Sequence, residues 1–206
     1  MLICVLGATG RIGQEWLKLA LADDHRMRAL VRDPNKINAV NDRFTWLKGD
    51  ATDLRHLVQA SEGAEAVISA LSTDGGNVLS VTAPLLVKAM KVNGIKRLIS
   101  IGTAGILDSR AEPGRLRYES SESRRKMTRS AMEHHRFYEE IAQSGLDWTI
   151  VCPTYLPDGP YTGNYRIERD RLPVGGESIS VADTAEFAFH QLRNKEFISA
   201  RVGISY

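Results

Sequence analysis

Gly7-Ala8-Thr9-Gly10-Arg11-Ile12-Gly13 joins a short apolar run, Leu2–Leu6, to an amphipathic stretch, Gln14–Ala22. The GxxGxxG spacing is weak on its own, but its place between a predicted strand and a predicted helix makes it specific. Glycines here permit a tight turn and a close backbone approach to a pyrophosphate, which the N–H groups of the helix N-terminus bind. The stretch therefore predicts a nucleotide-binding turn; a structural turn without a ligand is the alternative.

The same alternation of short apolar and longer amphipathic runs continues along the chain. The further apolar runs are Met27–Val31, Thr45–Lys48, Ala66–Leu71, Arg97–Ile101 and Trp148–Cys152, and the further amphipathic runs include Leu79–Val92 and Arg136–Gln143. This alternation predicts βαβ units, and continuously apolar strands are typical of a parallel sheet covered on both faces. We expect one α/β domain over residues 1–206: a Rossmann-type, doubly wound parallel sheet with a small C-terminal segment on the substrate side.

Two segments interrupt the alternation. Residues 108–130 contain Pro113, Gly114 and seven Arg or Lys against four acidic residues, which predicts a mobile loop or a poorly formed helix start. Residues 153–178 contain four prolines and precede a helix that starts near Val181, with Ser180 as its N-cap. We expect both segments to be loops on the substrate side of the sheet.

Composition restricts the function further. The chain has 206 residues, 43% hydrophobic and 25% charged, which suits one globular domain, and its net charge of +2 does not suggest nucleic-acid binding. No apolar run approaches the roughly 18 residues of a membrane span, and the N-terminus lacks the basic region of a signal peptide, so we expect no membrane partner and a cytoplasmic location. Cys4 and Cys152 lie in apolar runs, which favours buried thiols over a disulfide. Motifs of metalloproteases, zinc ribbons, NTPases and GxSxG hydrolases are absent, and no metal is expected.

The ends of the next predicted strands indicate which dinucleotide is bound. In NAD-binding proteins an acidic residue near the end of the second strand accepts the ribose hydroxyls. Here the first polar residue is Arg32, and Arg11 could reach the same 2′-phosphate, which favours NADP(H) over NAD(H). Asp33 complicates this reading, although it could instead cap the turn that contains Pro34. Arg32 as a solvated loop residue is the alternative.

Two later strand ends contribute further cofactor candidates. Asp50, beside Ala51, could accept from the adenine amino group, whereas Asp53 is expected to cap the following helix. The small residues of Ala70-Leu71-Ser72 would let the ribose and pyrophosphate pass close to the backbone.

Together, the GATGRIG turn, Leu30-Val31-Arg32-Asp33, Gly49-Asp50 and the Ser144–Thr149 junction resemble the atypical short-chain dehydrogenase/reductase family. Pro153, the stretch Asp158–Gly163 and Tyr206 resemble most its NAD(P)H-binding, NmrA-like branch of flavin reductases, which includes biliverdin-IXβ reductase. The resemblance covers essentially the whole chain. It implies a nicotinamide near Ser72, Thr103 and the segment Pro153-Thr154-Tyr155.

Standard members of the superfamily use a Tyr-x-x-x-Lys pair for proton transfer to a carbonyl, and no tyrosine of this chain is followed four residues later by lysine. The absence suits a planar acceptor that takes a hydride and draws its proton from solvent. Thr103 could hydrogen-bond the carboxamide or the substrate, and Tyr155 could stack on the acceptor or be an ordinary loop aromatic. His134 is a candidate general acid or a surface histidine; with His135 it makes a poor metal pair.

The sequence therefore predicts an NADPH-dependent reductase of a flavin or tetrapyrrole-like acceptor, as a monomer or homodimer. The alternative is a non-catalytic redox sensor of the NmrA-like type that binds NADP(H) and acts through a protein partner. A third interpretation, a nucleotide-sugar isomerase or epimerase, is weaker because the chain lacks both the Tyr–Lys pair and a sizeable substrate domain.

Overall fold

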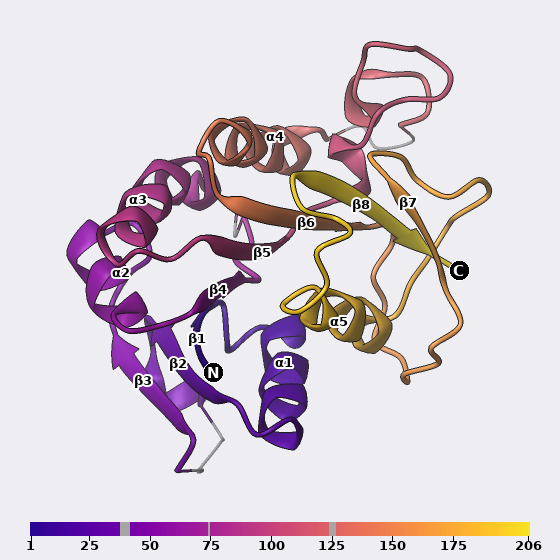
Figure 1. Cartoon of the computed structure of the whole chain (residues 1–206). Helices are drawn as coiled ribbons and strands as arrows, with labels where there is room; N and C mark the ends of the chain where they lie inside the picture. Colours follow the sequence, from indigo (N-terminus) through magenta and orange to yellow (C-terminus); the bar gives the residue numbers. More distant parts are fainter. Residues whose placement is uncertain (38–41, 74, 124–126) are drawn as a thin grey trace.

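The computed structural model describes residues 1–37, 42–73, 75–123 and 127–206, and these residues form one α/β domain around a central sheet (Figure 1). Within them the sheet has eight strands in the order β3-β2-β1-β4-β5-β6-β8-β7. The strands are β1 Leu2–Leu6, β2 Arg26–Val31, β3 Phe44–Lys48, β4 Ala66–Ser69, β5 Arg97–Ile101, β6 Asp147–Pro153, β7 Arg166–Arg169 and β8 Ala200–Ser205. The α-helices are α1 Arg11–Ala22, α2 Leu54–Ser61, α3 Val78–Val92, α4 Arg129–Ala142 and α5 Val181–His190.

The order of the strands indicates at which edge of the sheet a ligand would bind. β1 pairs in parallel with β2 on one side and with β4 on the other, so the chain reverses its direction of progress across the sheet at this point. In open α/β sheets, ligands bind in the crevice beyond the carboxyl ends of the strands at such a switch point. The predicted Rossmann-type, doubly wound sheet is confirmed.

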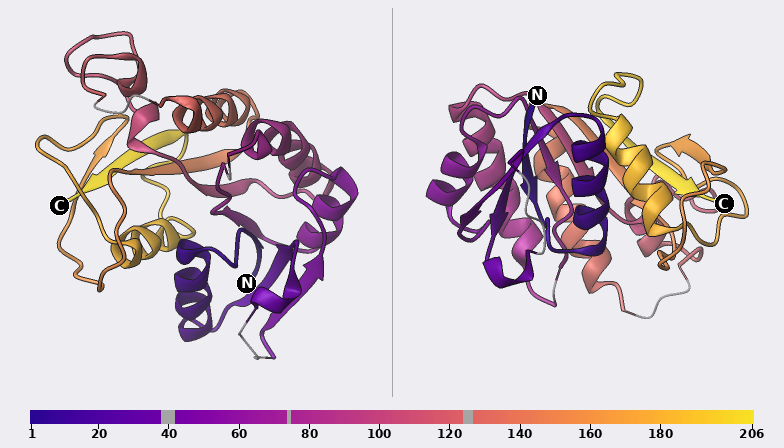
Figure 2. Two further views of the ribbon diagram at one scale, coloured as in Figure 1. Left: turned by 180° about the vertical axis from the view of Figure 1, so that it is seen from behind. Right: turned by 90° about the horizontal axis from the view of Figure 1, so that it is seen from below.

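Two helical layers cover the sheet (Figure 2). α1 and α5 pack on one face, over a core that includes Ile3, Val5, Ile68 and Val202. α2, α3 and α4 pack on the other face. Trp16 of α1 is fully buried, and its indole Nε1 donates to Ala185 O of α5 at 2.9 Å, which fixes the two helices side by side. No helix in the described ranges has the length and apolar character needed to cross a membrane.

Both cysteines are buried as free thiols, as predicted. Burial raises the pKa of Cys4 and of Cys152 to about 12, because a thiolate in an apolar interior is poorly solvated. Neither thiol is therefore a nucleophile in this fold.

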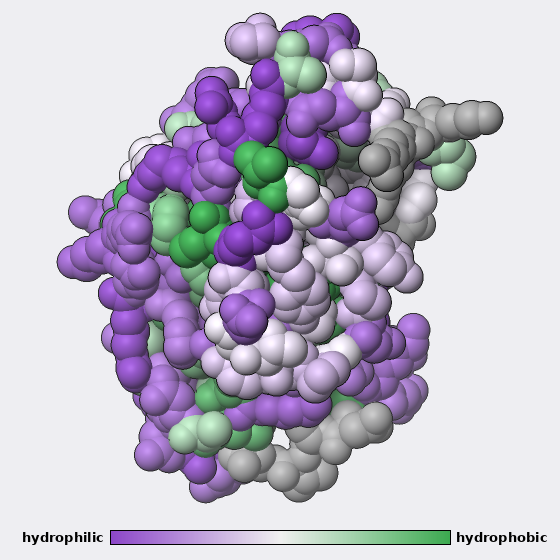
Figure 3. All heavy atoms as spheres, turned by 90° about the vertical axis from the view of Figure 1, so that its right-hand side faces the viewer, coloured by the Kyte–Doolittle hydropathy of each residue, from purple (hydrophilic) through white to green (hydrophobic). Residues whose placement is uncertain are grey.

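The C-terminal edge of the sheet is the part that the sequence pattern did not predict. β8 is parallel to β6, and β7 is antiparallel to β8. All of β8 is buried, but its apolar pattern is interrupted by Arg201, whose guanidinium bonds Asp108 at 2.7 Å and Asp170 at 3.3 Å. β7, with the sequence RIER, is a largely exposed edge strand and has no apolar period to detect. Figure 3 shows the face that carries this edge as mostly hydrophilic.

A carboxylate holds together the described part of segment 108–130, which we predicted to be a mobile loop or a poorly formed helix start. Glu122 accepts hydrogen bonds from Ser109 Oγ, Arg110 N at 2.8 Å and Arg117 Nη1 at 2.6 Å. Burial works to raise the pKa of Glu122, but these bonds outweigh it and hold the pKa below its usual range. The Glu122 carboxylate thus links separate parts of the segment; residues 124–126 lie outside the described residues.

Asp183 fastens the segment after β6 to α5. Its carboxylate is fully buried and accepts from Thr162 N at 2.8 Å, Gly163 N at 2.9 Å and the Tyr206 hydroxyl at 2.6 Å. Ser180 caps the helix as predicted, with its hydroxyl accepting from Asp183 N at 3.0 Å. Burial works to raise the pKa of Asp183, but the bonds from Tyr206, Gly163 and Thr162 prevail and the pKa is lowered.

Replacing Asp183 with asparagine is expected to lower the free energy of unfolding by about 3 kcal/mol, because several donors lose a buried, charged acceptor. Since its pKa is lower in the folded chain than in the unfolded one, the stabilisation is present above the unfolded value of about 3.9. It is lost as the pH falls through the folded pKa. Urea unfolding between neutral pH and about pH 3 measures the difference, with exposed Glu62→Gln as the control. A difference that does not shrink in acid would contradict this assignment.

Candidate cofactor and substrate site

The glycine-rich turn, residues 7–13, is as tight as its composition predicts. Gly10 N donates to Gly7 O at 3.0 Å. Gly7 has φ +79°, and a Cβ placed on it would lie 2.5 Å from Ala70 O; a Cβ on Gly13 would lie 2.2 Å from Gly7 O. Only glycine fits at these two positions, because backbone atoms that cannot move aside occupy the space. The turn therefore packs directly against the end of β4.

The N-terminus of α1 fits an anionic group. Its N-cap is Gly10, no side chain caps it, and no acidic residue lies in its first turn. Uncapped N–H groups at a helix start, together with the helix dipole, favour a phosphate. Gly10 is exposed, and a Cβ placed on it would meet only Gly7 O, at 3.3 Å, so the space beyond it is open. The turn can thus accept the pyrophosphate of a dinucleotide. Thr9 belongs to the same turn, and Ala8 and Ile12 are buried beneath it.

Arg32 and Asp50 lie at the carboxyl ends of β2 and β3. Asp50 Oδ1 accepts from Thr52 N at 2.9 Å and from Thr52 Oγ1 at 2.8 Å, and these bonds, with a smaller contribution from the charge of Arg32, lower the pKa of Asp50. Ala51 is buried next to it. Asp33 Oδ1 caps the short turn Pro34–Lys36 by accepting from Asn35 N at 3.1 Å. The carboxylate of Asp33 is therefore already bonded to a backbone N–H of its own turn. Arg32, the first polar residue after β2, is a cation.

Arg11 points to the other side of the turn. Its Nη1 donates to Leu156 O at 2.9 Å and to Asp158 Oδ1 at 3.0 Å. These acceptors follow β6, whereas Arg32 follows β2 on the opposite side of β1. The structure therefore does not bring Arg11 and Arg32 together around one phosphate.

The remaining predicted residues lie along the carboxyl ends of β4, β5 and β6. Ala70 N donates to Leu6 O at 2.9 Å and continues the β1–β4 pairing towards Leu71 and exposed Ser72. Thr103 follows β5, and its hydroxyl accepts from Gly105 N at 3.5 Å. Pro153 is buried, while Tyr155 is 64% exposed. The Thr154 hydroxyl is buried with no partner among the described residues.

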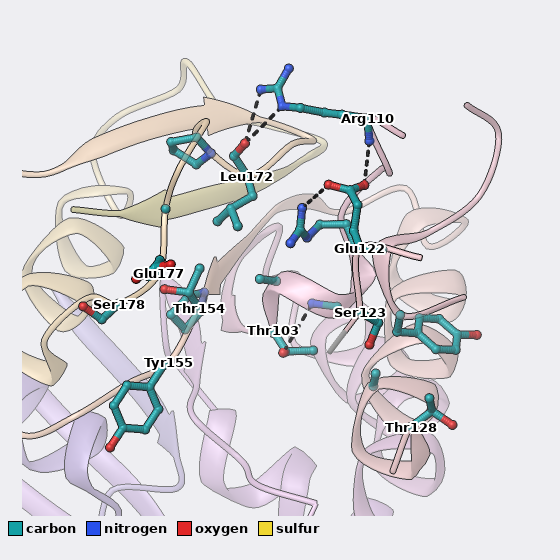
Figure 4. A pocket seen from close by; sticks show the side chains of 18 of the residues that line it. Thr103, Arg110, Glu122, Ser123, Thr128, Thr154, Tyr155, Leu172, Glu177 and Ser178 are labelled. Carbon is teal, nitrogen blue, oxygen red and sulfur yellow. Dashed lines mark hydrogen bonds and ion pairs between the residues drawn. The ribbon is translucent and has the colours of Figure 1, made fainter. Parts of the chain in front are cut away.

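A cavity of about 980 Å³ lies beyond the ends of β5 and β6 (Figure 4). Thr103 and Pro153–Tyr155 form its floor, and residues from the segments 104–123, 127–131 and 172–178 contribute its walls. In Figure 4, Thr103, Thr154, Tyr155 and Ser178 surround the open space. A volume of this size matches the upper range of small-molecule sites, about 300–1,000 Å³. The cavity thus adjoins the strand ends that would carry the nicotinamide half of a dinucleotide.

Arg110 joins the two walls; the sequence indicated a basic segment here but not these contacts. Its guanidinium donates to Leu172 O at 3.2 Å, and it also pairs with Glu168 of β7. Its backbone N–H donates to Glu122, within the same segment as Arg110. The basic character of segment 108–130 indicated cations here; the wall from Leu172 to Ser178 has no sequence signal apart from its glycines and proline.

His134 lies in α4 and is not among the residues that line the cavity. Burial of the ring lowers the pKa of His134 to about 4, because the imidazolium form is poorly solvated. The imidazole is neutral near pH 7 and carries no proton to donate as a cationic acid.

Comparison with known proteins agrees with this geometry. A family model described as NAD(P)H-binding matches residues 7–195. The NAD(P)H azoreductase of Xenophilus azovorans is 28% identical over 192 residues, which cover 91% of this chain but only 60% of that relative. A solved structure from Bacteroides thetaiotaomicron, named as a candidate epimerase, is 28% identical with a TM-score of 0.86, covering 100% of this chain and 96% of that one. A candidate NADH-flavin reductase from Streptococcus pneumoniae is 22% identical, has a TM-score of 0.82, covers 100% and 99% of the two chains, and shares the fold.

Proposed function

Because the chain belongs to the NAD(P)H-binding family whose model spans residues 7–195, we propose that it is a reductase that transfers a hydride from NADPH to a planar conjugated acceptor. The observation that carries the proposal is the cavity of about 980 Å³ at the ends of β5 and β6, directly beyond the predicted nicotinamide position. A flavin or an azo compound has the flat shape for such a space. The azoreductase relative, at 28% identity, supports an acceptor of this kind.

In this proposal each part of the site has its own role. The glycine-rich turn and the α1 N-terminus would hold the pyrophosphate, and Arg32 would hold the 2′-phosphate that distinguishes NADP(H) from NAD(H). Thr103 and Thr154 offer hydroxyls at the floor of the cavity, where they would orient the carboxamide or the acceptor. Bound NAD(P)H supplies the hydride, and the protein supplies orientation and exclusion of water.

The proton is the other half of the reduction. Thr103, Thr154 and Ser178 have ordinary hydroxyls and are weak acids, and none is followed by a lysine partner of the Tyr–Lys type. The cavity is open to solvent near Tyr155, which is 64% exposed. Water can therefore deliver the proton to an acceptor whose reduced form is stabilised by its own conjugation. A carbonyl substrate, and the nucleotide-sugar chemistry of an epimerase, would need the missing acid–base pair.

Replacing Tyr155 with alanine is expected to raise the KM for the acceptor roughly three- to tenfold, because aromatic stacking contributes about 0.5–1.5 kcal/mol. The KM for NADPH and the melting temperature should change little, since the ring lies at the cavity surface. Tyr155→Phe separates the two roles of the ring: it retains activity if Tyr155 stacks and loses it if the hydroxyl bonds the acceptor. An unchanged acceptor KM in Tyr155→Ala would remove Tyr155 from the site.

The proposed function is tested by steady-state oxidation of NADPH with riboflavin, FMN, biliverdin and a neutral azo dye. Saturable turnover with at least one acceptor is expected, with a lower kcat/KM for NADH. Tight NADPH binding without turnover on any of them would point instead to the sensor function, and copurification with and without NADPH would then identify a partner.

A further inference from the structure

Arg11 uses only part of its guanidinium in the contacts that it makes. Both bonds, to Leu156 O at 2.9 Å and to Asp158 Oδ1 at 3.0 Å, come from Nη1. Nη2 and Nε make no hydrogen bond or ion pair with the described residues, and the side chain is 56% exposed. An arginine has five N–H donors in a fixed plane, so the unused edge can bind a second acceptor without breaking the first pair.

The acceptors of Arg11 belong to a segment that is already fixed. Val181 N donates to Pro157 O at 3.1 Å, and the Ser180 hydroxyl donates to Pro160 O at 3.1 Å. The next residues, Thr162 and Gly163, donate to buried Asp183. Residues 156–163 are therefore held on the N-terminal end of α5. Leu156 O and Asp158 are therefore held in place as a pair of acceptors for Arg11, which we call the bracket. No loop has to become ordered before they bind Arg11.

The direction of the side chain decides which phosphate it can serve. Arg11 is the first residue of α1, where the pyrophosphate is expected, and it leans towards the segment after β6. β6 lies four strand positions from β2, about 19 Å at the usual 4.8 Å per strand. In Figure 1, α5 lies on the far side of α1 from β2 and β3. The 2′-phosphate site near Arg32 is thus on the wrong side for the arginine as it is held.

We propose that the bracket formed by Leu156 O and Asp158 orients Arg11 towards the pyrophosphate, so that Arg11 binds a group common to NADH and NADPH. Asp158 is a positioning residue that touches the cofactor only through Arg11. Of the two arginines, only Arg32 then discriminates between the two dinucleotides. The proposal needs the family's dinucleotide but not the reductase activity, so a protein that binds without turnover would still test it.

The test measures dissociation constants for NADPH and NADH by fluorescence titration, and dissociation rates by stopped flow, in Asp158→Asn. The matched control is Glu15→Gln, which changes the charge equally and breaks an exposed pair with Lys18 (2.7 Å) on the same helix. Asp158 is 82% exposed, so the fold should be unaffected. Both dissociation constants are expected to rise by the same factor, roughly two- to fivefold, beyond the control.

A double-mutant cycle separates positioning from a general charge effect. In an Arg11→Gln background, which itself weakens both dinucleotides, Asp158→Asn should have no further effect. Three results would overturn the proposal: an effect equal to that of Glu15→Gln, an effect on NADPH alone, or tighter binding in Asp158→Asn. The last would mean that Asp158 competes with the phosphate for Arg11.

Discussion

Gly10→Val is expected to weaken the binding of both NADPH and NADH by roughly ten- to a hundredfold while the protein stays folded. The N-cap has φ −79° and ψ 168°, which valine adopts readily; its Cβ would make one tight contact, with Gly7 O at 3.3 Å, which is expected to cost some stability without unfolding the chain. The added methyl groups would instead occupy the open space in front of the α1 N-terminus. Hydrogen bonds to a charged group contribute about 1.5–3 kcal/mol each, so losing one accounts for the change.

Isothermal titration with both dinucleotides measures this effect, alongside the melting temperature. Gly63→Ala is the control for loss of stability alone: Gly63 also has a positive φ, +69°, but nothing lies within 4 Å of its Cβ position. It should cost about 1 kcal/mol of stability and leave binding unchanged. If Gly10→Val binds NADPH as tightly as the wild type does, residues 7–13 are only a structural turn.

Arg32→Ala is expected to weaken NADPH binding roughly ten- to a hundredfold and to leave NADH binding nearly unchanged. The 2′-phosphate is a dianion, and a guanidinium that bonds it twice contributes more than an ordinary hydrogen bond. NADH has a hydroxyl in place of the 2′-phosphate, so its affinity should fall little. We do not expect Asp33 to bind the ribose hydroxyls in this variant, because its carboxylate already caps the turn Pro34–Lys36.

The ratio of the two dissociation constants measures the effect and cancels changes in stability. Arg26→Ala is the matched control, since Arg26 is an exposed arginine at the opposite end of the same strand, β2. The ratio should be unchanged there. An equal loss of both dinucleotides in Arg32→Ala would show that Arg32 acts on the shared adenosine and not on the 2′-phosphate.

Much of the fold follows from local patterns. The apolar runs from Leu2–Leu6 to Trp148–Cys152 coincide with β1 to β6, and the caps Asp53 and Ser180 begin α2 and α5 as expected. The sequence does not reveal β8 because Arg201 interrupts its apolar run. The burial of Arg201 depends on Asp108 and Asp170, which lie 93 and 31 residues away in the sequence. β7 is placed by its pairing with β8, a contact between chain segments that periodicity does not report.

The candidate site, like the fold, could be predicted from the sequence only in part. The glycine-rich turn is visible in the sequence because steric and backbone requirements are local to it. The partners of Arg11, Leu156 and Asp158, are 145 and 147 residues away, so the sequence suggested only that Arg11 could reach the same phosphate as Arg32 and did not reveal these bonds. The cavity wall likewise depends on a bond within segment 108–130, from Arg110 to Glu122, and on a bond from Arg110 to Leu172 in another loop.

The most direct test of the account is single-turnover reduction of the best acceptor by NADPH carrying deuterium on one or the other face of its nicotinamide ring. If the glycine-rich turn and the cavity form one site, the acceptor always meets the same face. Deuterium on that face should slow reduction by a primary isotope effect, and deuterium on the other face should leave the rate nearly unchanged. Equal rates with both labelled cofactors, or no reduction while NADPH is bound, would contradict direct hydride transfer in this cavity.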